Sequence, residues 1–323
     1  MKLLLRCALL CTTVLSFSET RVCAFSREGH ETIGLLGYTY GKLKPSAQQA
    51  VAQILAGQTI TDAAEWPDAI KAPYGALCKT PEAIAFIKAH PDHHLWHFVD
   101  FPVGATTYDF NGQFALNTDI VHAVEGCIGV LEGTGSFDGL TKVEALRYLV
   151  HLVGDAHQPL HTITGYFDVS DPAHPTLYPG DKPIPAGAFS DTGGNALVFG
   201  SKELHGIWDD DLVQAIANTK DSAALVKALL SSYDPAAYAT PGDYHHWIEA
   251  WVSDSMPLAA DAYGSLTFNA YSGSAAGNPG AHAQIQIKLP ANYTATESKV
   301  ESSQLLKGGA HLAQLLNAIA WAP

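Results

Sequence analysis

Apolar side chains recur at intervals of three and four residues in several segments, as on the buried face of a helix. In one of them, Val143, Leu146 and Val150 share a face. In another, Ser46 is placed to cap a helix that ends at Gly57. We predict helices over residues 47–56, 141–154, 205–216, 250–263 and 299–320.

Two stretches, residues 165–195 and 267–290, are rich in Gly together with Pro and Asp or with Ser, Ala and Asn. This composition predicts long loops. Neither stretch is a clear linker, because the helices on both sides are needed for one core. We find no regular alternation of strands and helices, and therefore expect an all-α, mostly helical single domain over residues 25–323.

The N-terminus has the three regions of a signal peptide in order: two basic residues, an apolar run over residues 7–17, and a small-x-small motif that ends at Ala24. We predict that residues 1–24 are removed and that Phe25 becomes the first residue. The alternative is an ordinary buried N-terminal helix. No later apolar run reaches the ~18 residues of a membrane span, so we expect an exported protein without a membrane segment.

The composition, 323 residues with 47% hydrophobic and 15% charged side chains, excludes a disordered chain. A net charge of −14 also excludes a protein that coats nucleic acid through a basic surface. The chain has 15 histidines beside 32 acidic residues, a composition that bound metal would explain. Only Cys78 and Cys127 remain after the predicted cleavage, so a metal would bind to His, Asp and Glu.

Histidine and aspartate gather in five patches: Gly29-His30, Trp66-Pro67-Asp68, His97-Phe98-Val99-Asp100, the run from His151 through Asp155 to His161, and His205-Gly206-Ile207-Trp208-Asp209. His151 and Asp155 are four residues apart, so a helix would place both side chains on one face. Pro159 is expected to end that helix and to let His161 turn back. Nitrogen and oxygen ligands of this kind suit zinc with an open water position.

A single pair with this spacing is more often an ordinary hydrogen bond. Two such pairs beside the other patches favour a metal centre. We predict that the remaining histidines are surface groups or support the ligands: His90, His93, His94, His122, His157, His174, His245, His246, His282 and His311.

Together these motifs resemble the zinc-dependent single-strand nucleases of the mould and mung-bean type, the S-one/P-one nucleases. The likeness runs from Phe25 to the Gly308-Gly309-Ala310-His311 segment, and the motifs follow the family's order. The resemblance implies a mostly helical fold shared with bacterial zinc phospholipases C, and three zinc ions as cofactors.

Carried over residue by residue, the resemblance implies three ligand sets. One zinc would be held by Asp68, His97, His151 and Asp155. A second would be held by His30, Asp155, and the amino group and carbonyl oxygen of Phe25. The third would be held by His161, His205 and Asp209.

The resemblance further implies hydrolysis of single-stranded DNA or RNA, and of 3′-nucleotides, at the 3′-O–P bond. A hydroxide bridging two zinc ions would attack and leave 5′-phosphates. Asp68, Asp155 and Lys71 would serve catalysis, with Lys71 at the place of an arginine in fungal members. Phe98, Asp100 and Asn195 would contact substrate.

Two alternatives stay open from the sequence. The chain could be a zinc phospholipase C, although that family has Glu where this chain has Asp209. It could also be a non-catalytic exported zinc-binding protein, although structural zinc sites are usually closed by four protein ligands. Nothing in the sequence implies an obligate protein partner.

Overall fold

The computed structural model describes residues 25–71, 73, 75–273 and 282–322. The predicted signal peptide and its cleavage motif lie outside this part of the chain. The longer helices are α1 Arg27–Leu35, α2 Pro45–Leu55, α3 Ile60–Ala69, α4 Pro81–Ala89, α5 Ile120–Glu132, α6 Lys142–Asp155, α9 Ser222–Leu229, α10 Trp247–Gly264 and α11 Tyr293–Ala318. The prediction of a mostly helical fold is confirmed.

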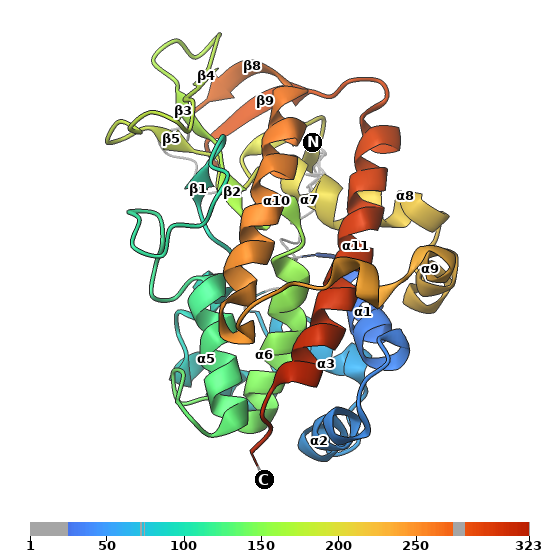
Figure 1. Ribbon diagram of the computed structural model, residues 1–323. Helices are drawn as coiled ribbons and strands as arrows, with labels where there is room; N and C mark the ends of the chain where they lie inside the picture. The colour runs from blue at the N-terminus through green and yellow to red at the C-terminus, as the bar shows by residue number, and fades with distance from the viewer. Residues whose placement is uncertain (1–24, 72, 74, 274–281, 323) are drawn as a thin grey trace, which may run out of the picture.

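Helix α6 lies at the centre of the helical layers, with α5 and α3 beside it and α10 and α11 crossing in front of it (Figure 1). Every residue from Tyr148 to Asp155 is buried. The helix begins at a capping box, in which the Thr141 hydroxyl accepts from the Glu144 backbone and the Glu144 carboxylate accepts from the Thr141 backbone. The N-terminus of α6 is therefore capped by polar groups, and its last turn lies buried in the interior.

Helix α1 packs closely against α11 because small residues line the contact. A Cβ atom added to Gly309 would lie 2.4 Å from Leu36 Cβ, and one added to Gly308 would lie 2.9 Å from Ile33 Cδ1. Real Cβ atoms do not approach so closely. The Gly308-Gly309 pair therefore sets how near α1, and with it His30, can come to the centre of the fold.

Helix boundaries differ from the predictions at identifiable residues. Helix α2 begins at Pro45 rather than after a Ser46 cap, because proline suits the first helical position. Helix α6 ends at Asp155, before Pro159, and Pro159 begins a 3₁₀ helix over Pro159–His161. The segment predicted over residues 205–216 is α7 Leu204–Gly206, a π-helix Ile207–Leu212 and α8 Val213–Ala217.

The two stretches predicted to be loops contain strands, so that prediction is wrong for part of each. The strands inside these stretches are β3 Tyr166–Asp168, β4 Thr176–Leu177, β5 Phe189–Ser190, β8 Thr267–Ser272 and β9 Gln284–Lys288. The other strands of the described residues are β1 Phe101–Pro102, β2 Ile163–Thr164, β6 Leu197–Phe199 and β7 Lys202–Glu203. They form sheets of order β1-β2, β4-β3-β5 and β7-β6-β9-β8, gathered at one end of the helices (Figure 1). The high content of turn-forming residues in these stretches obscured the short strands between the turns.

None of the described helices combines the length and apolarity that crossing a membrane requires. Cys78 and Cys127 are both free thiols, and Cys127 is fully buried.

Candidate metal centre

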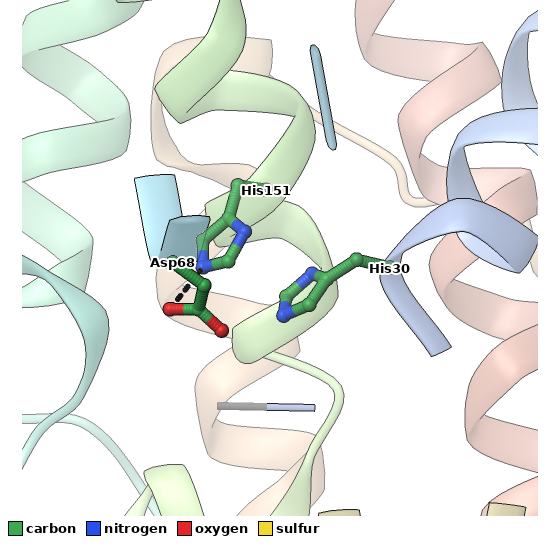
Figure 2. A group of neighbouring side chains, drawn as sticks. All are labelled: His30, Asp68 and His151. Carbon is green, nitrogen blue, oxygen red and sulfur yellow. Dashed lines mark ion pairs between the residues drawn. The ribbon is translucent and has the colours of Figure 1, made fainter. Parts of the chain in front are cut away.

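Three buried groups of His and Asp side chains present ligand atoms that lie within 4.8 Å of one another. Figure 2 shows the first, in which the rings of His30 and His151 and the carboxylate of Asp68 converge from three different helices. The other two groups are His97, His151 and Asp155, and His161, His205 and Asp209. The first two groups share His151, so they form one continuous cluster.

Asp155 is the carboxylate around which that cluster is arranged. Its Oδ2 atom lies 2.8 Å from His97 Nδ1 and 3.1 Å from His151 Nε2. Its Oδ1 atom lies 3.3 Å from His30 Nε2 and 3.6 Å from His161 Nδ1. Asp155 therefore touches members of all three groups.

The third group is built around the π-helix that follows α7. His205 Nε2 lies 3.4 Å from Asp209 Oδ2, one helical turn away. Asp209 Oδ1 accepts a hydrogen bond of 2.7 Å from the side-chain amide of Gln158. The amide orients the carboxylate and leaves Oδ2 directed toward the imidazoles.

Backbone carbonyls select the imidazole tautomer at three of the histidines. The Nδ1 atoms of His151, His161 and His205 lie 2.7 to 2.9 Å from the carbonyl oxygens of Ala64, His97 and Gly193. A carbonyl only accepts, so each neutral ring carries its proton on Nδ1 and presents the Nε2 lone pair to the centre. This is how metal-binding histidines are commonly oriented.

Several atoms of the cluster are buried without a hydrogen-bond partner: His30 Nδ1, Asp68 Oδ2, His97 Nε2, His161 Nε2 and Asp209 Oδ2. Burying polar atoms in this state is costly. Lone pairs of His151 and Asp155 also face each other. A cation among these atoms would satisfy both observations, so the donor set fits metal ions.

Burial lowers the pKa of four imidazoles of the cluster and so favours their neutral form: His30, His97, His161 and His205. Desolvation, together with the neighbouring His151, lowers the pKa of His30 to about 4. Desolvation and His161 lower the pKa of His205 to about 3. Burial would raise the pKa of Asp155, but His151 and His161 outweigh it and hold that pKa well below its usual value. These states, neutral imidazole and ionised carboxylate, are those that bind metal.

Asp209 and His151 are exceptions. Burial raises the pKa of Asp209 well above the ordinary value even though the Gln158 amide opposes the shift. Burial alone would lower the pKa of His151, but the negative charges of Asp155 and Asp68 outweigh burial and raise that pKa above its ordinary value. A nearby cation would restore the charged carboxylate and the neutral ring.

Glycines give His30 and Phe25 their space. A Cβ on Gly154, in the last turn of α6, would lie 2.8 Å from His30 Nδ1. A Cβ on Gly29 would lie 2.6 Å from the Phe25 ring. Phe25 is fully buried, with its ring edge-on to His30 at 5.9 Å between centroids. The first described residue thus lies against the cluster.

A cavity of about 450 Å³ opens onto the centre, and its wall includes Asp68, His97, His161 and His205. The predicted substrate residues Phe98, Asp100 and Asn195 line the same cavity, as does Lys71. Lys71 Nζ lies 2.6 Å from Asp68 Oδ1.

Phe98 and Asp100 point to the cavity because the chain is extended there. Phe98 has φ −154° and ψ 172°, so side chains two residues apart share a side. The intervening Val99 is buried in the core, and its amide donates 2.9 Å to the carbonyl of His161. The cavity wall at Phe98 and Asp100 is therefore joined directly to the turn that carries His161.

Sequence reasoning missed three supporting residues. Gln158, which lies in the run from His151 to His161, orients Asp209 through its side-chain amide. Asp191 is fully buried and accepts hydrogen bonds from the amides of Gly165 and Gly194 and from the Tyr263 hydroxyl. Burial raises the pKa of Asp191 to about 7. Nothing in the loop-like sequence around Asp191 indicated its contacts.

The third missed residue, Thr164, is also fully buried and connects Asp100 to Gly193 through its hydroxyl. Among the histidines predicted to lie at the surface or to support ligands, four are buried: His90, His93, His157 and His311. His157 and His311 support the turn after α6, joined by a 2.7 Å contact between Nε2 and Nδ1.

A family model described as S1/P1 Nuclease matches residues 25–321. Endonuclease 1 of Arabidopsis thaliana is 25% identical over 272 residues, which cover 78% of this chain and 77% of the relative. Endonuclease 2 of the same plant is 22% identical over 328 residues, covering 95% and 94%, and Endonuclease 4 is 22% identical over 316, covering 91% and 89%.

The fold and the buried His/Asp groups thus define a mostly helical nuclease of a metal-dependent class. The chain belongs to the S1/P1 nuclease family.

We predict that Gly154→Ala displaces His30 and lowers metal content. The added methyl would overlap Nδ1 and Cε1 of the ring, 2.8 and 3.2 Å away, while alanine itself is favourable in a helix. Metal content per chain and the circular dichroism spectrum should be measured together. Gly264→Ala, where an added Cβ meets nothing within 4 Å, is the matched control. Full metal content in Gly154→Ala would contradict the predicted role of His30.

We also predict that the metal-free protein loses stability between pH 7 and pH 5. The unfolded chain protonates His30 near pH 6.5, whereas the folded protein does so only near pH 4, so acid favours unfolding in that window. The free energy of unfolding should fall by about 1–2 kcal/mol for His30 alone. Denaturant titrations of the wild type and His30→Asn in chelator measure this difference, with the exposed His174→Asn as control. A His30→Asn variant with the wild-type pH slope would disprove it.

Proposed function

We propose that the chain is an exported nuclease that binds three zinc ions and cleaves single-stranded DNA or RNA. The bond cleaved would be 3′-O–P, leaving 5′-phosphates. The observation that carries the proposal is that one cavity is lined both by members of the His/Asp groups and by Phe98, Asp100 and Lys71. The family and the relatives named endonucleases support the reaction class.

Zinc is the metal that the donor set favours. All the candidate side-chain ligands are imidazole nitrogens and carboxylate oxygens, and none is a thiolate. Bound zinc would supply Lewis acidity and an activated water near neutral pH. Asp68, His97, His151 and Asp155 would hold one ion, and His161, His205 and Asp209 another. The remaining ion would be held by His30, Asp155 and the amino group and carbonyl oxygen of Phe25.

Within this proposal, Asp155 would be a ligand of both ions of the pair, since each of its oxygens faces an imidazole of the cluster. Asp68 would be a further ligand of one of these ions, and its Oδ1 atom holds the Lys71 ammonium group through the 2.6 Å contact. The ammonium group would then present positive charge to phosphate oxygens at the cavity wall. Lysine acts here as a point charge, without the bidentate geometry of an arginine.

Selection of single strands would come from Phe98 and Asp100. Phe98 offers an aromatic face to an unpaired base, a contact worth roughly 1–3 kcal/mol. Asp100 would accept hydrogen bonds from the edge of that base, and Asn195 would contact the substrate nearby. A base in a duplex is already stacked and paired, so it cannot reach these groups from the cavity mouth.

The acidic composition fits this arrangement. A net charge of −14 offers no extended basic groove for a duplex backbone. Metal ions would concentrate positive charge at one point instead. We therefore infer a weaker salt dependence than that of proteins that bind nucleic acid through many Lys and Arg side chains.

The decisive experiment uses protein that begins at Phe25. Metal analysis should give about three zinc ions per chain, and single-stranded DNA or RNA should be cleaved to 5′-phosphate ends, as assigned by end labelling. Duplex DNA and phosphatidylcholine vesicles are assayed beside them. Hydrolysis of the lipid alone would favour a phospholipase C, and zinc binding without any hydrolysis would favour a non-catalytic binding protein.

We predict that Asp155→Asn lowers turnover by more than about 100-fold, the upper range for changes that only support a ligand. The amide cannot bridge cations as a carboxylate does, so zinc content should also fall. The matched control is Asp171→Asn, whose side chain is 64% exposed. Near-normal turnover in Asp155→Asn would count against the bridging role.

A second prediction concerns the predicted cleavage after Ala24. Protein with extra residues ahead of Phe25 has an amide in place of the free amine, so it should lose one zinc and most activity. Zinc content and turnover are compared before and after proteolytic removal of the extension. An extended protein with full zinc and full turnover would refute Phe25 as a ligand.

A further inference from the structure

The hydroxyl of Thr164 lies between Asp100, on the cavity wall, and the loop that contains Gly193. Thr164 belongs to β2, which pairs in parallel with β1 so that Pro102 lies opposite Thr164. The residue is fully buried. Its Oγ1 atom contacts Asp100 Oδ1 at 2.5 Å and the amide nitrogen of Gly193 at 3.1 Å.

The available protons determine which group donates in each of these two hydrogen bonds. The Gly193 amide only donates, so Thr164 Oγ1 accepts from it. The single hydroxyl hydrogen is then free to be donated to Asp100 Oδ1. No other hydrogen bond to the Asp100 carboxylate is present in the described part of the chain. Thr164 therefore holds one oxygen of Asp100, and the other remains for a ligand in the cavity.

The same hydroxyl is linked to a candidate metal ligand. Gly193 donates its amide to Thr164, and the Gly193 carbonyl accepts from His205 Nδ1 at 2.7 Å. Gly193 has φ +64°, and a Cβ there would lie 2.6 Å from the Leu160 carbonyl oxygen. The loop is therefore rigidly placed, and Asp100 is held at a set position relative to His205.

We propose that Thr164 is a positioning residue that holds Asp100 as a hydrogen-bond acceptor and so makes this cavity select nucleobases by their N–H donors. The proposal rests on the proposed function. Guanine, adenine and cytosine each carry an exocyclic amine on the Watson–Crick edge. Uracil and thymine present one N–H between two carbonyl oxygens, which a carboxylate repels.

Burial also affects the charge state of the Asp100 carboxylate. Burial raises the pKa of Asp100, and the hydrogen bond from Thr164 opposes that rise. Loss of the hydroxyl would therefore remove both the fixed orientation and part of the stabilisation of the ionised carboxylate. Both effects weaken acceptance of a hydrogen bond from a base.

The test compares Thr164→Val, which keeps the shape and removes the hydroxyl, with Thr164→Ser, which keeps the hydroxyl. Substrates are short single strands that differ only in the base on the 5′ side of the cleaved bond. For guanine, adenine and cytosine, Thr164→Val should raise KM on the order of 10-fold, the loss expected for a hydrogen bond to a charged group. KM for uracil and kcat for all four should change less than about 2-fold.

Thr164→Ser should behave as the wild type, and Thr164→Val should have no further effect in an Asp100→Ala background. Zinc content should be unchanged. Calorimetric binding of guanosine and uridine 5′-monophosphates gives a second readout that needs no cleavage. There, Thr164→Val should remove the preference for the guanine nucleotide.

Unchanged base preference in Thr164→Val would overturn the inference. An equal loss for all four bases together with lost zinc would also overturn it, since Thr164 would then serve His205 alone. Failure of the wild type to cleave any nucleic acid is a separate result that refutes the proposed function. The nucleotide-binding arm still decides the role of Thr164 in that case.

Discussion

Asp155 is a fully buried carboxylate with four imidazoles within 3.6 Å, and the structure is organised around this crowding. Charges and lone pairs packed so closely in an interior are costly unless a cation lies among them. Helices α1, α3 and α6 and the turn after α6 each bring a candidate ligand to this point. The contacts that hold these elements in place therefore hold the site in place too.

The fold meets that constraint with backbone atoms and small residues. Carbonyl oxygens accept from Nδ1 of His151, His161 and His205 and so direct the opposite nitrogen inward. Gly154 makes room for His30, and the Gly308-Gly309 pair lets α1 approach α11. Several of the interior polar atoms left without partners thereby lie close together, where a metal ion could satisfy them.

The cavity wall follows from the same contacts. His97 ends a 3₁₀ helix, and the extended chain after it turns Phe98 and Asp100 toward the cavity while Val99 enters the core. Hydrogen bonds join this segment to His161 and, through Thr164, to Gly193. The candidate metal centre and the cavity wall beside it are thus built on one set of strands and turns.

The sequence by itself determined the helical class and the ligand types, because both depend on short spacings along the chain. The four-residue separations of His151 from Asp155 and of His205 from Asp209 place side chains one turn apart in a helix. The grouping of His30 with Asp68 and His151 joins residues from 38 to 121 positions apart, and no local pattern predicts it. The short strands within the Gly- and Pro-rich stretches, and the roles of Gln158, Thr164 and Asp191, were likewise decided only by tertiary structure. Their hydrogen-bond partners come from distant segments that meet only when the core is packed.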